Sequence, residues 1–232
     1  MKRILENRQY QNHLEEMVAS QVAEMTRMQD EVITGIANLI ESRDGSTGLH
    51  VKNTQNYVQI LTKALREKGM YPDILDHNYE PNTVKASVLH DIGKIKTPDA
   101  ILLKPGRLTD EEFEVMKQHT VAGCEIIDRI IGNVEHEEYV DIARKIARYH
   151  HERWDGTGYP DGLSGEEIPL CARIMALADV FDALYQDRCY KKAIRPASKV
   201  FEIIKEKSGS QFDPNLTEIF LELQREITDI SE

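Results

Sequence analysis

Apolar residues recur in steps of three and four along most of this 232-residue chain, and alternating strand patterns are absent. Such steps place apolar side chains on one face of a helix, whereas a half-buried strand needs strict alternation. The pattern therefore predicts an all-α fold of helices joined by short loops. A hydrophobic fraction of 41% allows a sizeable core, and the length fits one compact domain with an extension, or at most two small domains.

The N-terminal region predicts a long helix with the period of a coiled coil. Its apolar positions, interrupted by one glutamine, are Leu14, Val18, Gln21, Met25, Met28, Val32, Ile36 and Leu39. An ordinary amphipathic helix packed on its own domain would show a similar face. Because the flanks are strongly polar, we expect a connecting or dimerising helix at residues 1–32 and one domain at residues 33–232. The expected partners are a second copy of the chain and an upstream sensory or receiver domain, or other signalling proteins.

Local signals predict several helix ends. Thr109, followed by Glu112, has the pattern of a capping box that opens a helix. Pro196 is typical of a first helical turn, and the Ser-Gly pair at 208–209 predicts the end of that helix. Pro214 predicts the start of the last helix.

Charge and cysteine content limit the class of partner. A net charge of −11 argues against DNA, because non-specific binding to its backbone needs a basic face. A substrate that carries phosphates would therefore need a local cationic site or metal ions. Cys124, Cys171 and Cys189 form no CxxC pair and predict reduced thiols in the cytoplasm. No apolar run reaches the length of a membrane helix.

Histidines and acids predict a metal site near a long glycine-rich segment, HHERWDGTGYPDGLSGEEIP. The candidate ligands are His50, His90, Asp91, His119, His150, His151 and Asp179. Imidazole and carboxylate groups suit iron, manganese or zinc where thiolates are absent. His90 and Asp91 lie in one apolar stretch, and Asp179 and Asp182 in another; we expect both to be helical. Burial of a carboxylate there needs a partner charge or a metal. The alternative is a hydrogen-bonded core network without metal.

The order of these residues resembles the HD-GYP family, the HD phosphohydrolases that hydrolyse the bacterial signalling molecule cyclic di-GMP. The segments that carry the resemblance are RDGSTGLH, LHDIGKIKTPDAILLKPGRLT, MKQHTVAG, HHERWDGTGYPDGLSGEEIPLCARIMALADVFDAL and FDP. They extend from about Ile33 to the end of the chain. The resemblance implies an HD-type helical bundle and a phosphodiesterase that converts cyclic di-GMP mainly to linear pGpG through a hydroxide activated by two metals.

The resemblance also implies roles for single residues. Asp91 would bridge two divalent metals, most readily iron or manganese. One metal would take His50, His90 and Asp179, and the other His119, His150 and His151. The implied catalytic residues are Asp91, Lys94 and Asp182. The implied substrate contacts are Lys94, Gly158, Tyr159, Pro160, Arg188 and Lys191.

One departure concerns the number of metals. Family members with a third metal have a glutamate four residues before the first histidine, where this chain has Ser46. Glu41 lies more than a helical turn from that position, so we do not expect it to be a replacement. The resemblance then implies two metals and accumulation of pGpG, whereas three-metal members continue to GMP. A water that completes the same metal set is the alternative.

Three other functions are open from the sequence. The chain could bind cyclic di-GMP or a protein partner with little catalysis, although its motifs are intact apart from position 46. It could hydrolyse another cyclic dinucleotide, such as cyclic GMP-AMP, because base choice depends on loop geometry. It could be a diiron oxygenase, but Lys94 and the basic pair Arg188 and Lys191 suit a phosphate better.

Overall fold

The computed structural model describes residues 2–44, 49–132, 137–186 and 193–231. Over these ranges it contains helices, short 3₁₀ segments and loops without a β-sheet, which confirms the predicted all-α class. The helices are α1 (Lys2–Glu41), α2 (His50–Glu67), α3 (Tyr79–Ala86), α4 (Asp99–Leu102), α5 (Asp110–Ile131), α6 (Glu137–Tyr149), α7 (Leu170–Tyr185), α8 (Ala197–Glu206), α9 (Pro214–Glu222) and α10 (Gln224–Ser231). The 3₁₀ segments are η1 (Ser42–Asp44), η2 (Ser87–Leu89), η3 (Ile92–Lys96) and η4 (Gly165–Glu167).

The chain forms two compact units, residues 1–36 and 37–232. In the first unit, helix α1 exposes the apolar side chains of Val18, Met25 and Val32, with exposed fractions of 53%, 60% and 56%. The last turn of α1 belongs to the second unit, where Ala37 and Ile40 are buried. The apolar face of the first unit is therefore not buried within that unit.

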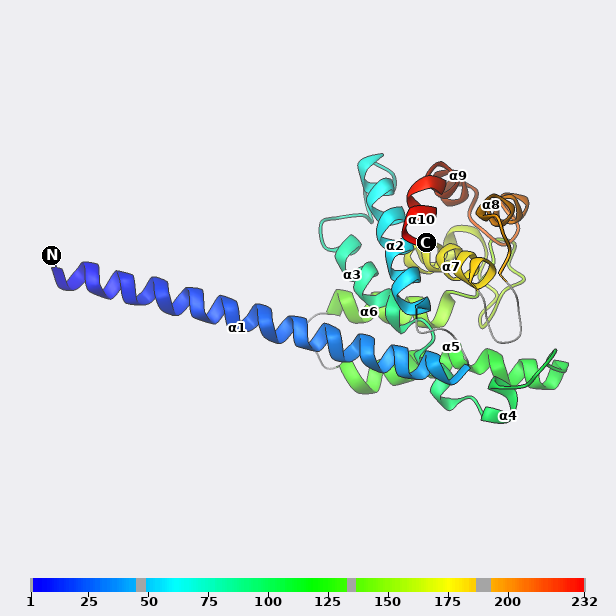
Figure 1. The fold of residues 1–232 in the computed structure, drawn as a ribbon, viewed down its shortest axis with the longest axis horizontal. Coiled ribbons are helices and arrows are strands. Elements are labelled where there is room, and N and C mark those ends of the chain that lie inside the picture. Colours follow the sequence, from blue (N-terminus) through cyan, green and yellow to red (C-terminus); the bar gives the residue numbers. More distant parts are fainter. Residues whose placement is uncertain (1, 45–48, 133–136, 187–192, 232) are drawn as a thin grey trace. The chain divides into compact units, whose positions relative to one another are not determined.

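Helices α2 and α7 pack against each other in the core of the second unit, and α10 lies against α2 (Figure 1). Tyr57 of α2 and Phe181 of α7 meet edge to face, with ring centroids 5.1 Å apart. Phe201 and Phe220 extend this aromatic cluster from α8 and α9. Helix α7 is apolar around most of its circumference, as is typical of a buried helix. Its carboxylate at Asp182 is consequently held inside the core.

Three predicted helix boundaries agree with the structure. Thr109 accepts a hydrogen bond from the backbone N–H of Glu112, whose carboxylate accepts one from the N–H of Thr109, so α5 opens with the predicted capping box. Pro196 directly precedes α8, which ends shortly before the predicted Ser-Gly pair. Pro214 is the first residue of α9, and the side chain of Asp213 caps it.

Two predictions about helices were wrong. The stretch that leads to His90 is not one helix, because α3 ends at Ala86 and the chain continues through the 3₁₀ segments η2 and η3. Helix α9 is not the last one, since α10 follows it. Between them Leu223 has φ −87° and ψ 11°, which interrupts the α-helical geometry.

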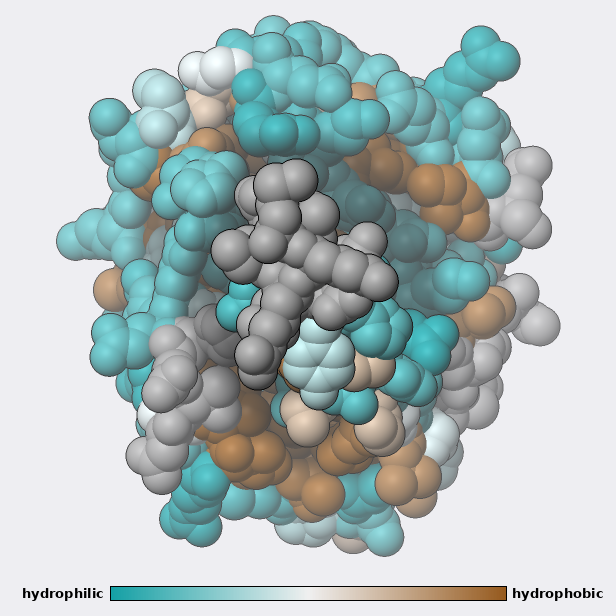
Figure 2. Space-filling view, turned by 90° about the vertical axis from the view of Figure 1, so that its left-hand side faces the viewer, coloured by the Kyte–Doolittle hydropathy of each residue, from teal (hydrophilic) through white to brown (hydrophobic). Residues whose placement is uncertain are grey.

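The surface is mixed in character. In the space-filling view, hydrophilic residues cover most of the coloured surface, and hydrophobic side chains gather in smaller areas (Figure 2). Exposed apolar side chains are normal in folded proteins. Among the described residues, no helix combines the length and the apolar character that crossing a bilayer requires.

Candidate metal centre

The two carboxylate oxygens of Asp91 face different imidazoles. Oδ2 lies 3.2 Å from Nε2 of His90, while Oδ1 lies 3.2 Å from Nε2 of His119 and 3.7 Å from Nε2 of His150. Asp91 directly precedes η3, and the residue is only 6% exposed. A buried carboxylate that presents one oxygen to each side can bridge two cations.

Potential ligand atoms gather in two groups that share Asp91, and within each group they lie within 4.8 Å of one another. One group is Asp91, His119, His150 and His151, and the other is Glu41, His50, His90 and Asp91. The structure therefore brings together the predicted ligands other than Asp179. That residue stands next to the second group, with its Oδ1 3.5 Å from Nε2 of His50.

Gly93 allows α5 to approach η3 closely enough for this arrangement. A Cβ atom at Gly93 would lie 1.8 Å from the carbonyl oxygen of His119 and 2.5 Å from the backbone nitrogen of Gly123. Neither backbone atom can move without shifting α5. A side chain at position 93 would therefore push His119 away from Asp91.

Backbone carbonyls orient the imidazoles of three predicted ligands. Nδ1 of His90 lies 2.9 Å from the carbonyl oxygen of Ser87. Nδ1 of His119 lies 2.7 Å from the carbonyl oxygen of Met116, and Nδ1 of His150 lies 2.9 Å from that of Ile146. A carbonyl oxygen only accepts hydrogen bonds, so each Nδ1 is the donor. With Nδ1 bonded in this way, each Nε2 points at the centre, as in metal-binding histidines.

Several buried atoms of this centre have no hydrogen-bond partner. They are Oδ1 of Asp91, Nε2 of His119 and Nε2 of His150. Unpaired buried polar atoms are costly, because each has lost its bonds to water. Their close grouping, together with the fixed tautomers, fits a divalent cation bound by carboxylate and imidazole.

His50 is held by an acid in the core. Its Nδ1 lies 2.7 Å from Oδ2 of Asp182, and Asn53 donates a hydrogen bond of 3.0 Å to Oδ1 of the same carboxylate. The other ring nitrogen of His50 lies 3.3 Å from Nε2 of His90. Asp182, predicted as catalytic, is therefore placed on the side of His50 that faces away from His90, where it can fix the ring.

Glu41 was not expected to replace the family glutamate, yet it lies in one of the two ligand groups. Glu41 is 2% exposed, and its Oε1 lies 3.1 Å from Nζ of Lys94, which also lies 2.7 Å from Oδ2 of Asp91. Together with Ala37 and Ile40 it forms the buried stripe at the end of α1. The available signal in the sequence was that Glu41 follows the apolar residue Ile40 at the end of the helix. An acid buried at such a position needs a partner, because acids are seldom fully buried without one.

Burial and neighbouring charges together shift the pKa values of the groups in this centre. Burial alone lowers the pKa of His90, but the adjacent Asp91 carboxylate outweighs it and raises the pKa to about 9. Burial and the neighbouring imidazoles lower the pKa of His150, and lower that of His151 further. Burial opposes ionisation of Asp91, yet Lys94 and His90 hold its pKa well below the usual range. The centre thus keeps its carboxylate charged and the His150–His151 pair neutral.

Glu152 fixes the glycine-rich loop that follows the two histidines. Its buried carboxylate accepts hydrogen bonds from the backbone N–H groups of Asp161, Gly162 and Leu163, at 2.7, 3.0 and 3.1 Å. Gly158 packs on the backbone of Glu152, where a Cβ atom would lie 2.5 Å from its Cα. The loop therefore folds back onto the residue next to the predicted ligands.

This fold of the loop brings Tyr159 to the centre. The Tyr159 N–H donates to the His151 carbonyl at 3.3 Å, and the two rings lie 4.9 Å apart at 34°. The ring of His119 is 6.5 Å away. Burial, followed by the charge of Asp91, raises the pKa of Tyr159, so its hydroxyl stays protonated. Pro160 follows through a cis peptide bond.

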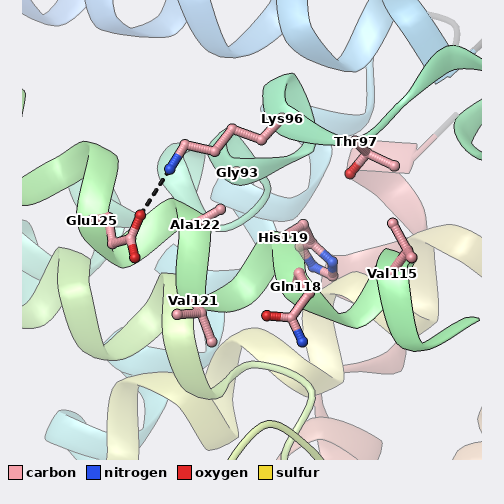
Figure 3. A pocket seen from close by; sticks show the side chains of 9 residues that line it. All are labelled: Gly93, Lys96, Thr97, Val115, Gln118, His119, Val121, Ala122 and Glu125. Atoms are coloured by element: carbon pink, nitrogen blue, oxygen red, sulfur yellow. Dashed lines mark hydrogen bonds and ion pairs between the residues drawn. The ribbon is translucent and has the colours of Figure 1, made fainter.

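A separate cavity of about 190 Å³ lies between η3 and α5 (Figure 3). Its lining includes Gly93, Val115 and Gln118, and an ion pair between Lys96 and Glu125 crosses one side at 2.8 Å. His119 is the one predicted ligand that lines it. The cavity therefore does not coincide with the ligand groups.

Four residues of the sequence predictions lie outside the described part of the chain. They are Ser46, Arg188, Cys189 and Lys191.

Curated relatives match this chain over most of its length. It is 44% identical over 211 residues to a cyclic di-GMP phosphodiesterase of Vibrio cholerae, covering 90% of this chain and 42% of the relative. It is 42% identical over 200 residues to a cyclic di-GMP phosphodiesterase of Thermotoga maritima, covering 86% of this chain and 50% of the relative. A 3'3'-cGAMP-specific phosphodiesterase of Vibrio cholerae is 38% identical over 192 residues, covering 83% and 34%. The chain spans about half the length of these relatives or less.

Two solved structures share the fold at low sequence identity. An HDGYP protein from Bdellovibrio bacteriovorus has a TM-score of 0.54 and 17% identity, covering 84% of this chain and 61% of the other. A cyclic GMP-AMP phosphodiesterase of Vibrio cholerae has a TM-score of 0.56 and 19% identity, covering 86% and 52%. The HD domain family matches residues 12–216. The chain therefore belongs to the HD domain family, and its motifs are those of the HD-GYP subgroup.

Proposed function

We propose that this chain is a metal-dependent phosphodiesterase that hydrolyses cyclic di-GMP, mainly to linear pGpG. The observation that carries the proposal is the position of Asp91 between two groups of imidazoles. The names of the relatives, which match most of this chain, support cyclic di-GMP as the substrate.

The ligand set that we propose is His50, His90, Asp91 and Asp179 for one divalent ion and Asp91, His119, His150 and His151 for the other. When bound, two such ions would lower the pKa of a water and neutralise charge on a phosphodiester. Iron and manganese are the ions we expect, because the donors are imidazole and carboxylate. Since position 46 is serine, we expect two ions rather than three.

The chain's own residues would bind and orient the substrate. Lys94 presents an ammonium group beside Asp91 and can bind an oxygen of the scissile phosphate. Tyr159 closes the side of the centre at His151 and keeps a protonated hydroxyl that can donate to the ligand. We also propose that Gly158 and Pro160 shape this side, and that Arg188 and Lys191 bind the phosphates or a guanine edge.

Product analysis tests the proposed reaction. The metal-quantified protein would be incubated with cyclic di-GMP without oxygen, and the nucleotides would be separated by chromatography. We expect pGpG to accumulate before GMP. GMP formed as fast as pGpG would contradict the two-metal proposal, and intact substrate with a fully metallated protein would favour a binding module.

Cyclic GMP-AMP is the second candidate substrate, because relatives specific for it match this chain and one solved structure of that class shares the fold. A competition assay with equal amounts of both cyclic dinucleotides would show which of them is the preferred substrate. We expect the larger kcat/KM with cyclic di-GMP. A preference for cyclic GMP-AMP would reverse the assignment.

We further propose that α1 pairs with α1 of a second copy, in the cytoplasm, where the three cysteines would stay reduced. The exposed side chains of Val18, Met25 and Val32 repeat at the seven-residue spacing of a coiled-coil seam. Sedimentation should show a dimer at micromolar concentration. Replacing Met25 by Glu should give a monomer, and a monomeric wild-type protein would refute the pairing.

A further inference from the structure

Helix α5 carries an exposed aromatic residue beside the loop that covers the metal centre. Phe113 has an exposed fraction of 44%, the largest of any aromatic side chain in the described part of residues 37–232. Its ring meets the ring of Tyr159 edge to face, with centroids 5.9 Å apart. The exposed part of this ring, next to Tyr159, is available for stacking on a flat ligand.

Lys117, one turn further along α5, adds a positive charge at the same place. Its Nζ lies 5.5 Å from the ring centroid of Phe113 and 5.8 Å from that of Tyr159. Both distances are within the range of a cation–π contact. The ammonium group also pairs with Glu114 at 2.5 Å, and that carboxylate is mostly exposed. A ligand phosphate could therefore exchange with Glu114 at little cost.

This pair is connected to the metal centre through Tyr159. The ring of Tyr159 contacts Phe113 on one side and lies 4.9 Å from the ring of His151 on another. A molecule bound at the imidazoles and large enough to pass Tyr159 would reach Phe113 and Lys117. Figure 3 shows the face of α5 with Val115 and Gln118, and the cavity there does not include Phe113 or Lys117.

We propose that Phe113 and Lys117 form a nucleotide subsite, in which Phe113 stacks on a purine base and Lys117 binds the phosphate that is not cleaved. This proposal rests on the proposed function. A cyclic dinucleotide has two bases and two phosphates, so the half that is not at the metal centre needs its own contacts. Aromatic stacking accepts any purine, and therefore the subsite contributes affinity rather than a choice between guanine and adenine.

The test compares Phe113→Ala, Phe113→Trp and Lys117→Met with the wild-type protein on two substrates. One is cyclic di-GMP, and the other is methyl p-nitrophenyl phosphate, which has one phosphate and no purine. We expect Phe113→Ala to raise the KM for cyclic di-GMP about tenfold, the scale of a lost base stack, while Phe113→Trp keeps it near the wild-type value. Lys117→Met should raise the same KM about fivefold, and Glu114→Gln should lower it.

The control variants are Val115→Ala, on the same helix at 40% exposure, and Lys145→Met, which removes another lysine paired within a helix. Both should leave the KM within about twofold of wild type, as expected for surface changes. Equal losses on both substrates in Phe113→Ala, with reduced metal content, would show a structural role and overturn the proposal. An unchanged KM in both Phe113→Ala and Lys117→Met would overturn it as well.

A binding titration separates this proposal from the proposed function. If the metallated wild-type protein does not hydrolyse cyclic di-GMP, its affinity is measured by calorimetry for the wild type and Phe113→Ala. Weaker binding by the variant would support the subsite while the hydrolytic function fails. Equal binding, or no binding by either protein, would refute the subsite.

Discussion

The Oδ1 atom of Asp91 lies 3.2 Å from Nε2 of His119, although the two residues belong to different elements that meet through Gly93. Both atoms are buried without a hydrogen-bond partner. The contact therefore joins an acid and an imidazole that a cation would satisfy together.

Replacing Asp91 by Asn should remove the shared ligand. We expect metal affinity to fall by more than about 100-fold and hydrolysis to be lost. This loss exceeds that caused by changing a residue that only hydrogen-bonds a metal ligand. Metal content after dialysis and kcat give the two readings. Asp128→Asn, at an exposed acid that pairs with Arg144, is the control. A variant at position 91 that keeps its full metal content would contradict the bridging role.

Asp182→Asn tests whether the core acid orients His50. The change removes the charge next to Nδ1 and lets the ring turn, so metal affinity should fall about 10- to 100-fold. Isothermal titration with Mn²⁺ measures this directly. Asp141→Asn, at an exposed acid paired with Lys145, should behave like wild type. If affinity is unchanged but kcat collapses, Asp182 acts in the reaction itself, as the sequence analysis predicted.

Glu152→Ala should loosen the loop that carries Tyr159. Three backbone N–H groups lose their acceptor, and each such loss costs about 1–3 kcal/mol if water cannot replace it. We expect faster hydrogen exchange at residues 161–163 and a higher KM, with metal content largely kept. Glu166→Gln, an exposed neighbour, is the matched control. Unchanged exchange at these amides would show that the carboxylate does not hold the loop.

Metal binding should release a proton from His90. Its pKa is raised from 6.5 to about 9, so between these values the ring holds a proton in the folded, metal-free protein. A cation needs that nitrogen free, and therefore apparent metal affinity should rise with pH up to about 9. Titrations in buffers of different ionisation enthalpy count the protons. No proton release at pH 7.5 would contradict this.

The sequence predicted the ligand residues of the centre better than it predicted the backbone conformation around them. His90, His119 and His150 could be named because imidazoles and acids in apolar stretches need a common partner. The 3₁₀ segments around Asp91 could not be foreseen, because they depend on the contact of Gly93 with α5. The fold class followed from the helical period, which does not depend on tertiary contacts.

Several contacts around the centre arise only in three dimensions and were not predicted. Glu41 is nine positions before His50 in the sequence, yet both belong to one ligand group. Phe113 and Lys117 look like surface residues of an amphipathic helix until Tyr159 is seen beside them. The catalytic role of Asp182 stays a prediction, but its contact with Nδ1 of His50 could not be read from the sequence.

The most direct test of the central claim is a metal titration of the stripped protein, followed by cyclic di-GMP hydrolysis without oxygen. We predict no activity without metal and a rise that levels off at about two Mn²⁺ or Fe²⁺ per chain, with pGpG as the main product. Hydrolysis that survives complete removal of metal would contradict the account, as would a saturated protein that leaves cyclic di-GMP intact.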